Sequence, residues 1–210
     1  MIKIKQFKYS SDNFGYLVYG ENEAVAVDGG DTKGILKFIR RHDLTLTTVT
    51  NTHSHSDHTP GNQDLLRETQ AVFLDTETLY KTNSIKLEQD SLAIYHTPGH
   101  TEDSFSFYTG SALITGDTLF NGTVGNCFSG DMKGFLKSIH TLMDFPPETV
   151  IYAGHDYVND SMTYAKIIEP YNTDKIEEYL SGYNPEHVRS TIAEERKANP
   201  YVRYNSDRMI

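Results

Sequence analysis

The segment THSHSDH, residues 52–58, holds three of the nine histidines of this chain together with an aspartate. On an extended segment residues i and i+2 face the same way. His53 and His55 can therefore present two ring nitrogens to one cation, while Asp57 and His58 turn toward another. Zinc takes three or four nitrogen, oxygen or sulfur ligands at about 2.0–2.2 Å. The segment alone cannot complete two such sites, so further ligands are expected elsewhere.

Three more candidate ligands follow segments that read as short apolar strands. His100 stands in TPGHT, Asp117 follows ALITG, and His155 follows TVIYAG. A set composed of histidine and aspartate matches two cations that share one bridging carboxylate. Such a site accepts Zn, Fe or Mn according to availability. The residues therefore predict a dinuclear centre and leave the identity of the metals open.

Short apolar strands that alternate with helices must position these side chains, and they predict an α/β fold. Strands are expected at 16–20, 24–30, 46–53, 71–75, 92–99, 104–110, 112–117 and 149–155, and helices at 33–42 and from Asp131. Beyond about residue 156 the pattern changes to helices, at 159–169, 174–182 and 185–198. On the helix after Asp131, we expect Phe135, Leu136 and Ile139 to face the core.

Composition excludes several functional classes. The net charge of -10 argues against broad binding to nucleic acid or to anionic membranes, since both would repel the chain. No apolar run approaches the roughly 20 residues of a membrane helix. The first residues, MIKIKQFKYS, alternate like a strand and lack the apolar region of a secretory signal, which favours a cytoplasmic protein. The only cysteine, Cys127, excludes an intramolecular disulfide. The oligomeric state stays open.

The order HxHxDH, then separated His, Asp and His, resembles the metallo-β-lactamase superfamily. Within it, the chain is similar to the hydroxyacylglutathione hydrolases (glyoxalase II) through TVTNTHSHSDHTPGN, TPGHT, TGDTLF, FPPETVIYAGHDY, AKIIEPYN and NPYVR. The resemblance implies an αββα sandwich with the site at the edges of its two sheets. We accordingly predict a metallo-β-lactamase-like domain over residues 1–156 and a short helical C-terminal region over 157–210 packed on it.

The resemblance also implies a role for each ligand. The first metal is expected on His53, His55 and His100, the second on Asp57, His58 and His155, with Asp117 bridging. Two cations about 3.5–4 Å apart activate a water molecule and polarise a carbonyl group. Asp57 can also orient the attacking hydroxide, which gives it a catalytic role. A small-molecule thioester suits this site because its thiolate leaves without strong acid assistance.

The chain departs from glyoxalase II where glutathione is held. That family usually has Cys-Gly-Lys/Arg-Phe-Tyr/Phe-Glu-Gly after GDTLF, whereas this chain has VGNCFSG, with Asn126 at the basic position and Phe128 at the aromatic one. Tyr157 matches the family's substrate-contacting tyrosine. The basic segment that longer members carry beyond the position of NPYVR has no counterpart before Ile210. We therefore expect weakened affinity for glutathione.

Two other functions stay open. A persulfide dioxygenase with one iron would use residues corresponding to His53, His100 and Asp117, and members of that branch resemble NTHSHSDH, HDY and STIAEERKANP. A non-catalytic metal-binding module is disfavoured because the ligand set is complete. The histidines outside the motifs are expected at the surface or in packing: His42, His96, His140 and His187. Asp28, before Gly29 and Gly30, either orients a ligand histidine or only closes a turn.

Overall fold

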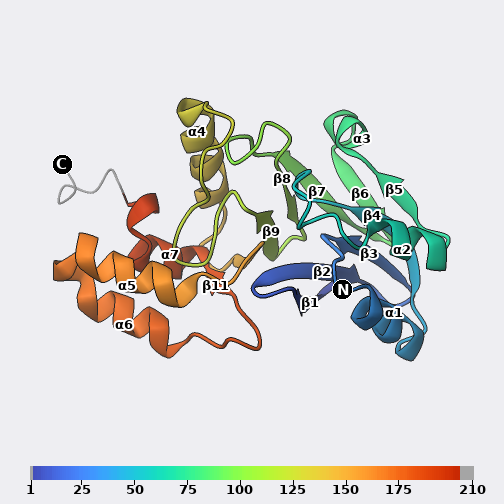
Figure 1. Ribbon diagram of the computed structural model, residues 1–210, viewed down its shortest axis with the longest axis horizontal. Helices are drawn as coiled ribbons and strands as arrows, with labels where there is room; N and C mark the ends of the chain where they lie inside the picture. Colours follow the sequence, from blue (N-terminus) through green and yellow to red (C-terminus); the bar gives the residue numbers. More distant parts are fainter. Residues whose placement is uncertain (1, 204–210) are drawn as a thin grey trace. The chain divides into compact units, whose positions relative to one another are not determined.

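The structure is a computed structural model that describes residues 2–203, and the chain divides into two compact units (Figure 1). The first unit comprises the chain up to His96 together with Asp103–Gly110. The second unit comprises Thr97–Glu102 and the chain from Ser111 onward. The predicted division at residue 156 stays a prediction, and its last residues, 204–210, lie outside the described range.

A mixed five-stranded sheet organises the first unit. Its order is β1 (Lys3–Tyr9), β2 (Asn13–Tyr19), β3 (Glu23–Val27), β4 (Thr45–Thr50) and β5 (Val72–Leu74). The first three strands run antiparallel, whereas β3, β4 and β5 run parallel. Nearly every residue of β2 is buried, on both faces, as expected for an inner strand of a layered α/β fold.

Helices α1 (Thr32–Arg41) and α2 (Asn62–Glu68) pack on this sheet (Figure 1). The α1 helix begins where predicted because the Asp31 side chain accepts a hydrogen bond from the Gly34 N–H. Its buried face, including Ile35 and Ile39, joins Leu17 of β2 and Leu65 of α2 in one apolar core. Replacing a buried isoleucine there by alanine should cost about 2–5 kcal/mol.

The remainder of the first unit is α3 (Thr76–Lys81) and the antiparallel strands β6 (Ser84–Leu87), β7 (Asp90–His96) and β8 (Phe105–Tyr108). The predicted strand at 92–99 ends at His96, earlier than expected. Pro98 lacks the N–H that a continuing ladder requires. The residues after it, Thr97–Glu102, belong to the second unit.

A parallel strand pair organises the second unit. Strands β9 (Ala112–Gly116) and β10 (Val150–Ala153) are parallel, and α4 (Met132–Met143) lies between them in the chain. The Asp131 side chain caps α4, as predicted, by accepting a hydrogen bond from the Gly134 N–H. Phe135 and Ile139 are buried, but Leu136, expected in the core, is 37% exposed.

The last described part of the chain is helical: α5 (Val158–Ile168), the 3-10 turn η1 (Pro170–Asn172), α6 (Thr173–Ser181), α7 (Ile192–Ala198) and the 3-10 turn η2 (Pro200–Val202). The prediction of one helix over 185–198 was wrong at its start. Residues Ser190–Thr191 form β11, antiparallel to β10, and α7 begins only at Ile192. The reason is a capping box, in which Thr191 and Glu194 satisfy each other's backbone N–H groups. None of the helices within residues 2–203 has the length and apolar character needed to cross a bilayer.

A buried carboxylate ties α7 to the loop that follows β9. Glu195 is fully buried and accepts hydrogen bonds from the Gly122 N–H, the Tyr179 hydroxyl, the Ser190 hydroxyl and the Asn199 amide. Burial raises the pKa of Glu195 above its usual range, although these donors act in the opposite direction. The C-terminal helices of the second unit thereby fix the backbone of the loop at residue 122.

Candidate metal centre

In the first unit, the parallel pair β3–β4 places the histidine segment. Val27 pairs with Thr50, so the residues after these two positions meet at the same edge of the sheet. Asp28 follows β3 with φ 52°, a left-handed conformation, and its carbonyl accepts the Gly30 N–H to form a turn. The segment 51–58 follows β4. The residues after β3 and after β4 therefore supply side chains to the same edge of the five-stranded sheet.

Asp28 organises the histidine segment. Its carboxylate accepts hydrogen bonds from the Thr52 N–H at 2.8 Å and the Thr52 hydroxyl at 2.7 Å. It also lies 3.0 Å from Nδ1 of His58, and both side chains are fully buried. A histidine whose Nδ1–H is held by a carboxylate presents Nε2 as its ligand atom. The Asp28 backbone thus closes the turn, and its carboxylate orients the His58 ring, whose role as a metal ligand stays a prediction.

His53 and His55 converge as their spacing predicts. Nε2 of His53 lies 2.9 Å from Nδ1 of His55. The other nitrogen of His53, Nδ1, lies 3.0 Å from the Thr52 hydroxyl. His53 is buried and His55 is partly exposed. Two ring nitrogens this close can bind one cation together.

Asp57 stands at the exposed side of the same segment. Its Oδ2 accepts a hydrogen bond from the Asn13 amide at 3.0 Å and lies 3.7 Å from Nε2 of His58. Its backbone carbonyl accepts the Tyr9 hydroxyl at 2.8 Å. Tyr9 and Asn13 border the turn between β1 and β2, and sequence reasoning missed both. No motif marks them, because they reach Asp57 only through the pairing of distant strands.

In the second unit, the carboxyl ends of the parallel pair β9–β10 likewise bring candidate ligands together. Gly154 N–H donates to the Gly116 carbonyl at 2.9 Å, so the residues that follow, Asp117 and His155, are adjacent. Oδ2 of Asp117 lies 3.4 Å from Nε2 of His155 and 3.5 Å from Nε2 of His100. All three side chains are buried. One carboxylate oxygen of Asp117 thus faces two imidazole nitrogens, and its role as a bridging ligand stays a prediction.

The backbone of residues 125–128 fixes His100. Its Nδ1–H donates to the Asn126 carbonyl at 3.0 Å, and the Phe128 N–H donates to the His100 carbonyl at 3.1 Å. A Cβ atom on Gly125 would lie 1.8 Å from the Asp117 carbonyl oxygen and 3.2 Å from Nδ1 of His100. Only glycine fits there. Sequence reasoning treated Asn126 as a substrate contact and missed this backbone role, which side-chain type does not reveal.

Aromatic side chains border the ligands of the second unit. The Tyr157 ring stacks on His155 with centroids 5.1 Å apart and planes 5° from parallel. The exposed Phe128 ring meets His100 edge-on at 5.2 Å. Their contact with substrate stays a prediction, but each lies beside a histidine that is predicted to bind metal.

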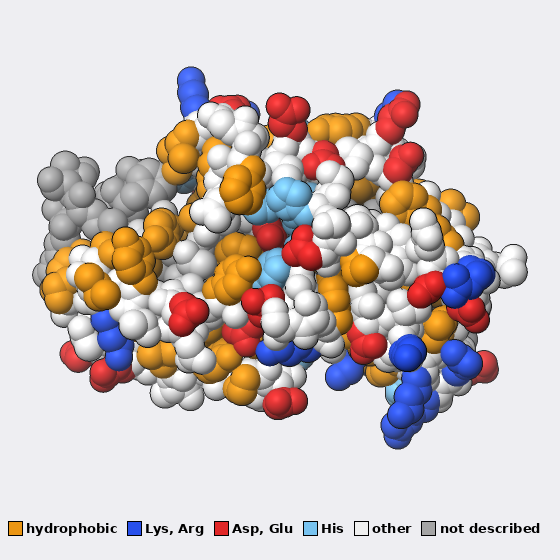
Figure 2. Space-filling model, in the orientation of Figure 1, with side chains coloured by type: hydrophobic (Ala, Val, Ile, Leu, Met, Phe, Trp, Pro, Cys, Tyr) orange, Lys and Arg blue, Asp and Glu red, His pale blue; other side chains and the backbone are white. Residues whose placement is uncertain are grey.

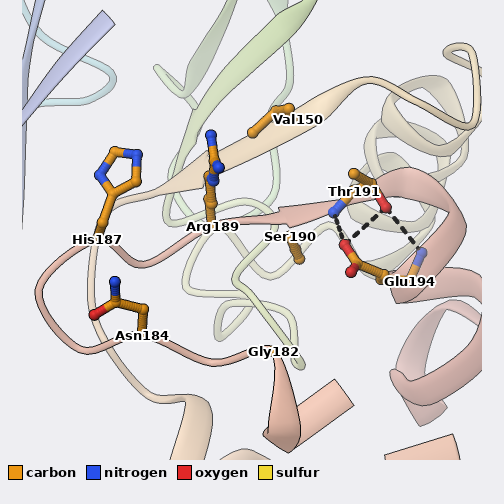
Figure 3. A pocket seen from close by; sticks show the side chains of 8 residues that line it. All are labelled: Val150, Gly182, Asn184, His187, Arg189, Ser190, Thr191 and Glu194. Atoms are coloured by element: carbon orange, nitrogen blue, oxygen red, sulfur yellow. Dashed lines mark hydrogen bonds between the residues drawn. The ribbon is translucent and has the colours of Figure 1, made fainter. Parts of the chain in front are cut away.

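The other histidines have different surroundings. Nε2 of the exposed His96 lies 3.1 Å from the Tyr80 hydroxyl, and the His42 ring packs on Phe38. His187 lines a pocket of 450 Å³ beside β11, where Thr191 and Glu194 form the capping box (Figure 3). In the part of the chain that the structure describes, no predicted ligand lines this pocket.

The donor set fits transition-metal binding. Side chains able to hold a metal occur in both units: His53, His55, Asp57 and His58 in the first, and His100, Asp117 and His155 in the second. Nδ1 faces an oxygen in three of these histidines, His53, His58 and His100. Such outer contacts fix ring orientation in metal sites. The arrangement therefore combines nitrogen and carboxylate donors with the support that ligands need.

Comparison with known proteins identifies the family. The pattern of the metallo-β-lactamase superfamily matches residues 13–74 and 72–155. The hydroxyacylglutathione hydrolase of Pseudoalteromonas translucida is 32% identical over 97% of this chain and 86% of its own length. That of Bartonella tribocorum is 31% identical over 96% and 88%. The crystal structure of ETHE1 from Myxococcus xanthus, 26% identical, matches with a TM-score of 0.75 over 99% of this chain and 87% of that one. The α/β architecture, the His/Asp clusters and these matches agree: this chain belongs to the metallo-β-lactamase superfamily.

Proposed function

We propose that this protein is a metal-dependent thioester hydrolase of the glyoxalase II type, which converts an S-2-hydroxyacylglutathione or a related thioester to an acid and a thiol. The observation that carries the proposal is the complete His/Asp set: the first-unit residues and Asp117 and His155 follow parallel strand pairs, and His100 lies in the loop after β7. Relatives named hydroxyacylglutathione hydrolase, similar over nearly the whole chain, support the reaction class.

The proposal assigns two divalent metal ions, zinc first and iron or manganese as alternatives, to the seven ligands. His53, His55 and His100 would hold one ion, Asp57, His58 and His155 would hold the other, and both would share Asp117. When bound, such ions supply Lewis acidity, which lowers the pKa of water and polarises a carbonyl oxygen.

Side chains of the protein would orient the attacking water and the ligand rings, and would supply negative charge beside the metal ions. Asp57, which is exposed and accepts a hydrogen bond from the Asn13 amide, would accept a hydrogen bond from the attacking water. Asp28 accepts a hydrogen bond from Nδ1–H of His58, so the lone pair of Nε2 stays available to bind a metal ion. The Asp117 carboxylate lies beside the imidazole rings of His100 and His155. A thiolate leaves without a strong general acid, and the proposed mechanism needs none.

Substrate recognition is assigned to Tyr157, Phe128 and Asn126. The substrate is a small-molecule thioester, and the proposal includes neither nucleic acid nor membrane as partner and places the enzyme in the cytoplasm. Asn126 carries no charge where glyoxalase II enzymes usually have a basic residue, so glutathione is held weakly. The replacement of a basic residue by Asn126 would weaken affinity for glutathione and would leave the hydrolytic groups unchanged.

Metal analysis combined with a thioester panel tests the proposal. Protein purified without chelator should contain two transition-metal ions per chain and hydrolyse thioesters. One iron per chain, with oxygen uptake on a persulfide and no thioester hydrolysis, would instead support the persulfide dioxygenase. Bound metal with neither thioester hydrolysis nor oxygen uptake would favour the non-catalytic metal-binding module.

A further inference from the structure

The second unit contains an apolar pocket that none of the seven proposed metal ligands lines. Its volume is 360 Å³, within the range in which proteins enclose small ligands. Its walls come from the loop 124–127, from α4 and from the ends of the C-terminal segments, with Met132, Leu136, Ile139, Ile168 and Tyr201 as principal side chains. The exposed Leu136, which sequence analysis expected in the core, is explained by its place in this wall.

The pocket shares a wall with two of the ligands. Gly125 and Asn126 line it. Gly125 also packs against the Asp117 backbone so closely that a Cβ has no room, and the Asn126 carbonyl accepts the Nδ1–H of His100. A molecule in the pocket therefore lies one backbone layer from His100 and Asp117.

The side chains that line the pocket favour an uncharged, apolar ligand. Among the described residues that form the pocket, none carries a charged side chain, and Asn126, Cys127 and Tyr201 supply the polar groups. Glutathione, with two carboxylates and an ammonium group, would lose hydration there without compensation. An alkyl or aromatic group gains from leaving water.

We infer that this pocket binds an apolar group of the thioester substrate, an inference that rests on the proposed hydrolase function. The group belongs either to the acyl side or to the thiol side of the thioester. In both cases the pocket sets specificity by chain length, while the His/Asp set performs the same hydrolysis.

Two matched substrate series distinguish the acyl side from the thiol side. One series lengthens the acyl chain of N-acetylcysteamine thioesters from acetyl through butanoyl and hexanoyl to octanoyl. The other keeps the acetyl group and lengthens an alkanethiol. In one series KM should fall by about two- to fourfold per methylene until the pocket is full. Hydrolysis with a KM independent of length in both series would overturn the inference.

Neighbouring residues on α5 provide matched variants. Ile168 lines the pocket and is 37% exposed, whereas Ile167 is 71% exposed and is not among the lining residues. Apolar side chains are visible over α5 in Figure 2. Ile168→Gln should remove most of the dependence on chain length, and Ile167→Gln should leave it unchanged. Equal behaviour of the two variants, each shown to be folded by thermal unfolding, would contradict the assignment.

A binding measurement separates the pocket from the reaction. Calorimetry with S-hexyl-N-acetylcysteamine, a thioether that cannot be hydrolysed, should show binding that Ile168→Gln weakens by about tenfold or more. Binding without hydrolysis of any thioester would support the pocket and overturn the proposed function. Hydrolysis without thioether binding would support the function and overturn the pocket.

Discussion

In both units a parallel strand pair positions proposed metal ligands, but the two units distribute these residues differently along the sequence. In each, a parallel strand pair ends in side chains at one sheet edge, β3–β4 in the first unit and β9–β10 in the second. The first unit has its four proposed ligands in one short segment, residues 53–58. The second has its three proposed ligands in three separate segments. The first unit therefore carries a compact motif, whereas the second carries a dispersed one, with His100 outside its parallel strand pair.

The supports of the two halves differ as well. A buried side chain, Asp28, holds the segment of the first unit. Backbone groups hold the ligands of the second, through the Asn126 carbonyl, the close approach of Gly125 and the loop that Glu195 anchors at Gly122. We expect a single side-chain substitution to disturb the first half locally. The second half should respond to changes that move its backbone.

The largest expected effect comes from Asp117, the carboxylate against two histidines. Asp117→Ala should abolish most hydrolysis, by more than the roughly 10- to 100-fold loss that changes in outer contacts cause. Elemental analysis and steady-state kinetics measure it. His96→Ala is the control, and its activity should stay within a few-fold. If the His96 variant lost metal and a His100 variant retained it, His96 and not His100 would be the ligand.

Glu195→Gln tests the backbone support of the second unit through its stability. The amide cannot accept from all the donors around Glu195, so the free energy of unfolding should fall by about 2–4 kcal/mol. Denaturant unfolding measures this. Glu194→Gln is the neighbouring control, because glutamine also serves in a capping box, and it should cost less than about 0.5 kcal/mol. Equal losses would show that the buried network does not support the loop.

The same carboxyl predicts a pH dependence. Burial raises the pKa of Glu195, so the folded state binds this proton more tightly than the unfolded chain. Its contribution to stability is therefore complete below the unfolded pKa and declines as the pH rises through the folded pKa. Unfolding free energies measured upward from about pH 4 should show this decline in wild type. Persistence of the full slope in Glu195→Gln would assign it to another group.

Asp28→Asn tests the side-chain support of the first unit. The amide retains one acceptor oxygen, which cannot serve both Thr52 and His58 as the carboxylate does. Metal affinity should fall about 10- to 100-fold. Competition with a chromogenic chelator measures it. Unchanged affinity would mean that the segment 53–58 holds its own geometry.

The smallest effect is expected at Asn126, where the backbone matters more than the side chain. Asn126→Lys retains the carbonyl that accepts from His100 and adds a cation toward anionic substrates. KM for S-lactoylglutathione should fall about tenfold, with little change in kcat. A wild-type KM that the lysine does not change would show that other residues hold glutathione.

The sequence reveals side-chain motifs better than backbone positions. Strand ends, the Asp131 cap and the convergence of His53 with His55 were predictable because they depend on local spacing. Asn13, Tyr9 and Gly125 were not, since each reaches the ligands through pairing or packing of distant segments. The late start of α7 was also missed, because the capping box at Thr191 competes with a helical pattern that extends further upstream.

The segment Thr97–Glu102, which carries His100, belongs to the second unit although the first unit flanks it in the chain on both sides. Neither unit is therefore encoded by one continuous stretch of gene. A single recombination event between two relatives cannot exchange either unit whole: a crossover just after Gly110 would join one parent's His100 to the other parent's Asp117 and Asn126. Because the Asn126 carbonyl accepts the His100 proton, such a hybrid would have to inherit a compatible loop by chance, and the two units should be inherited together.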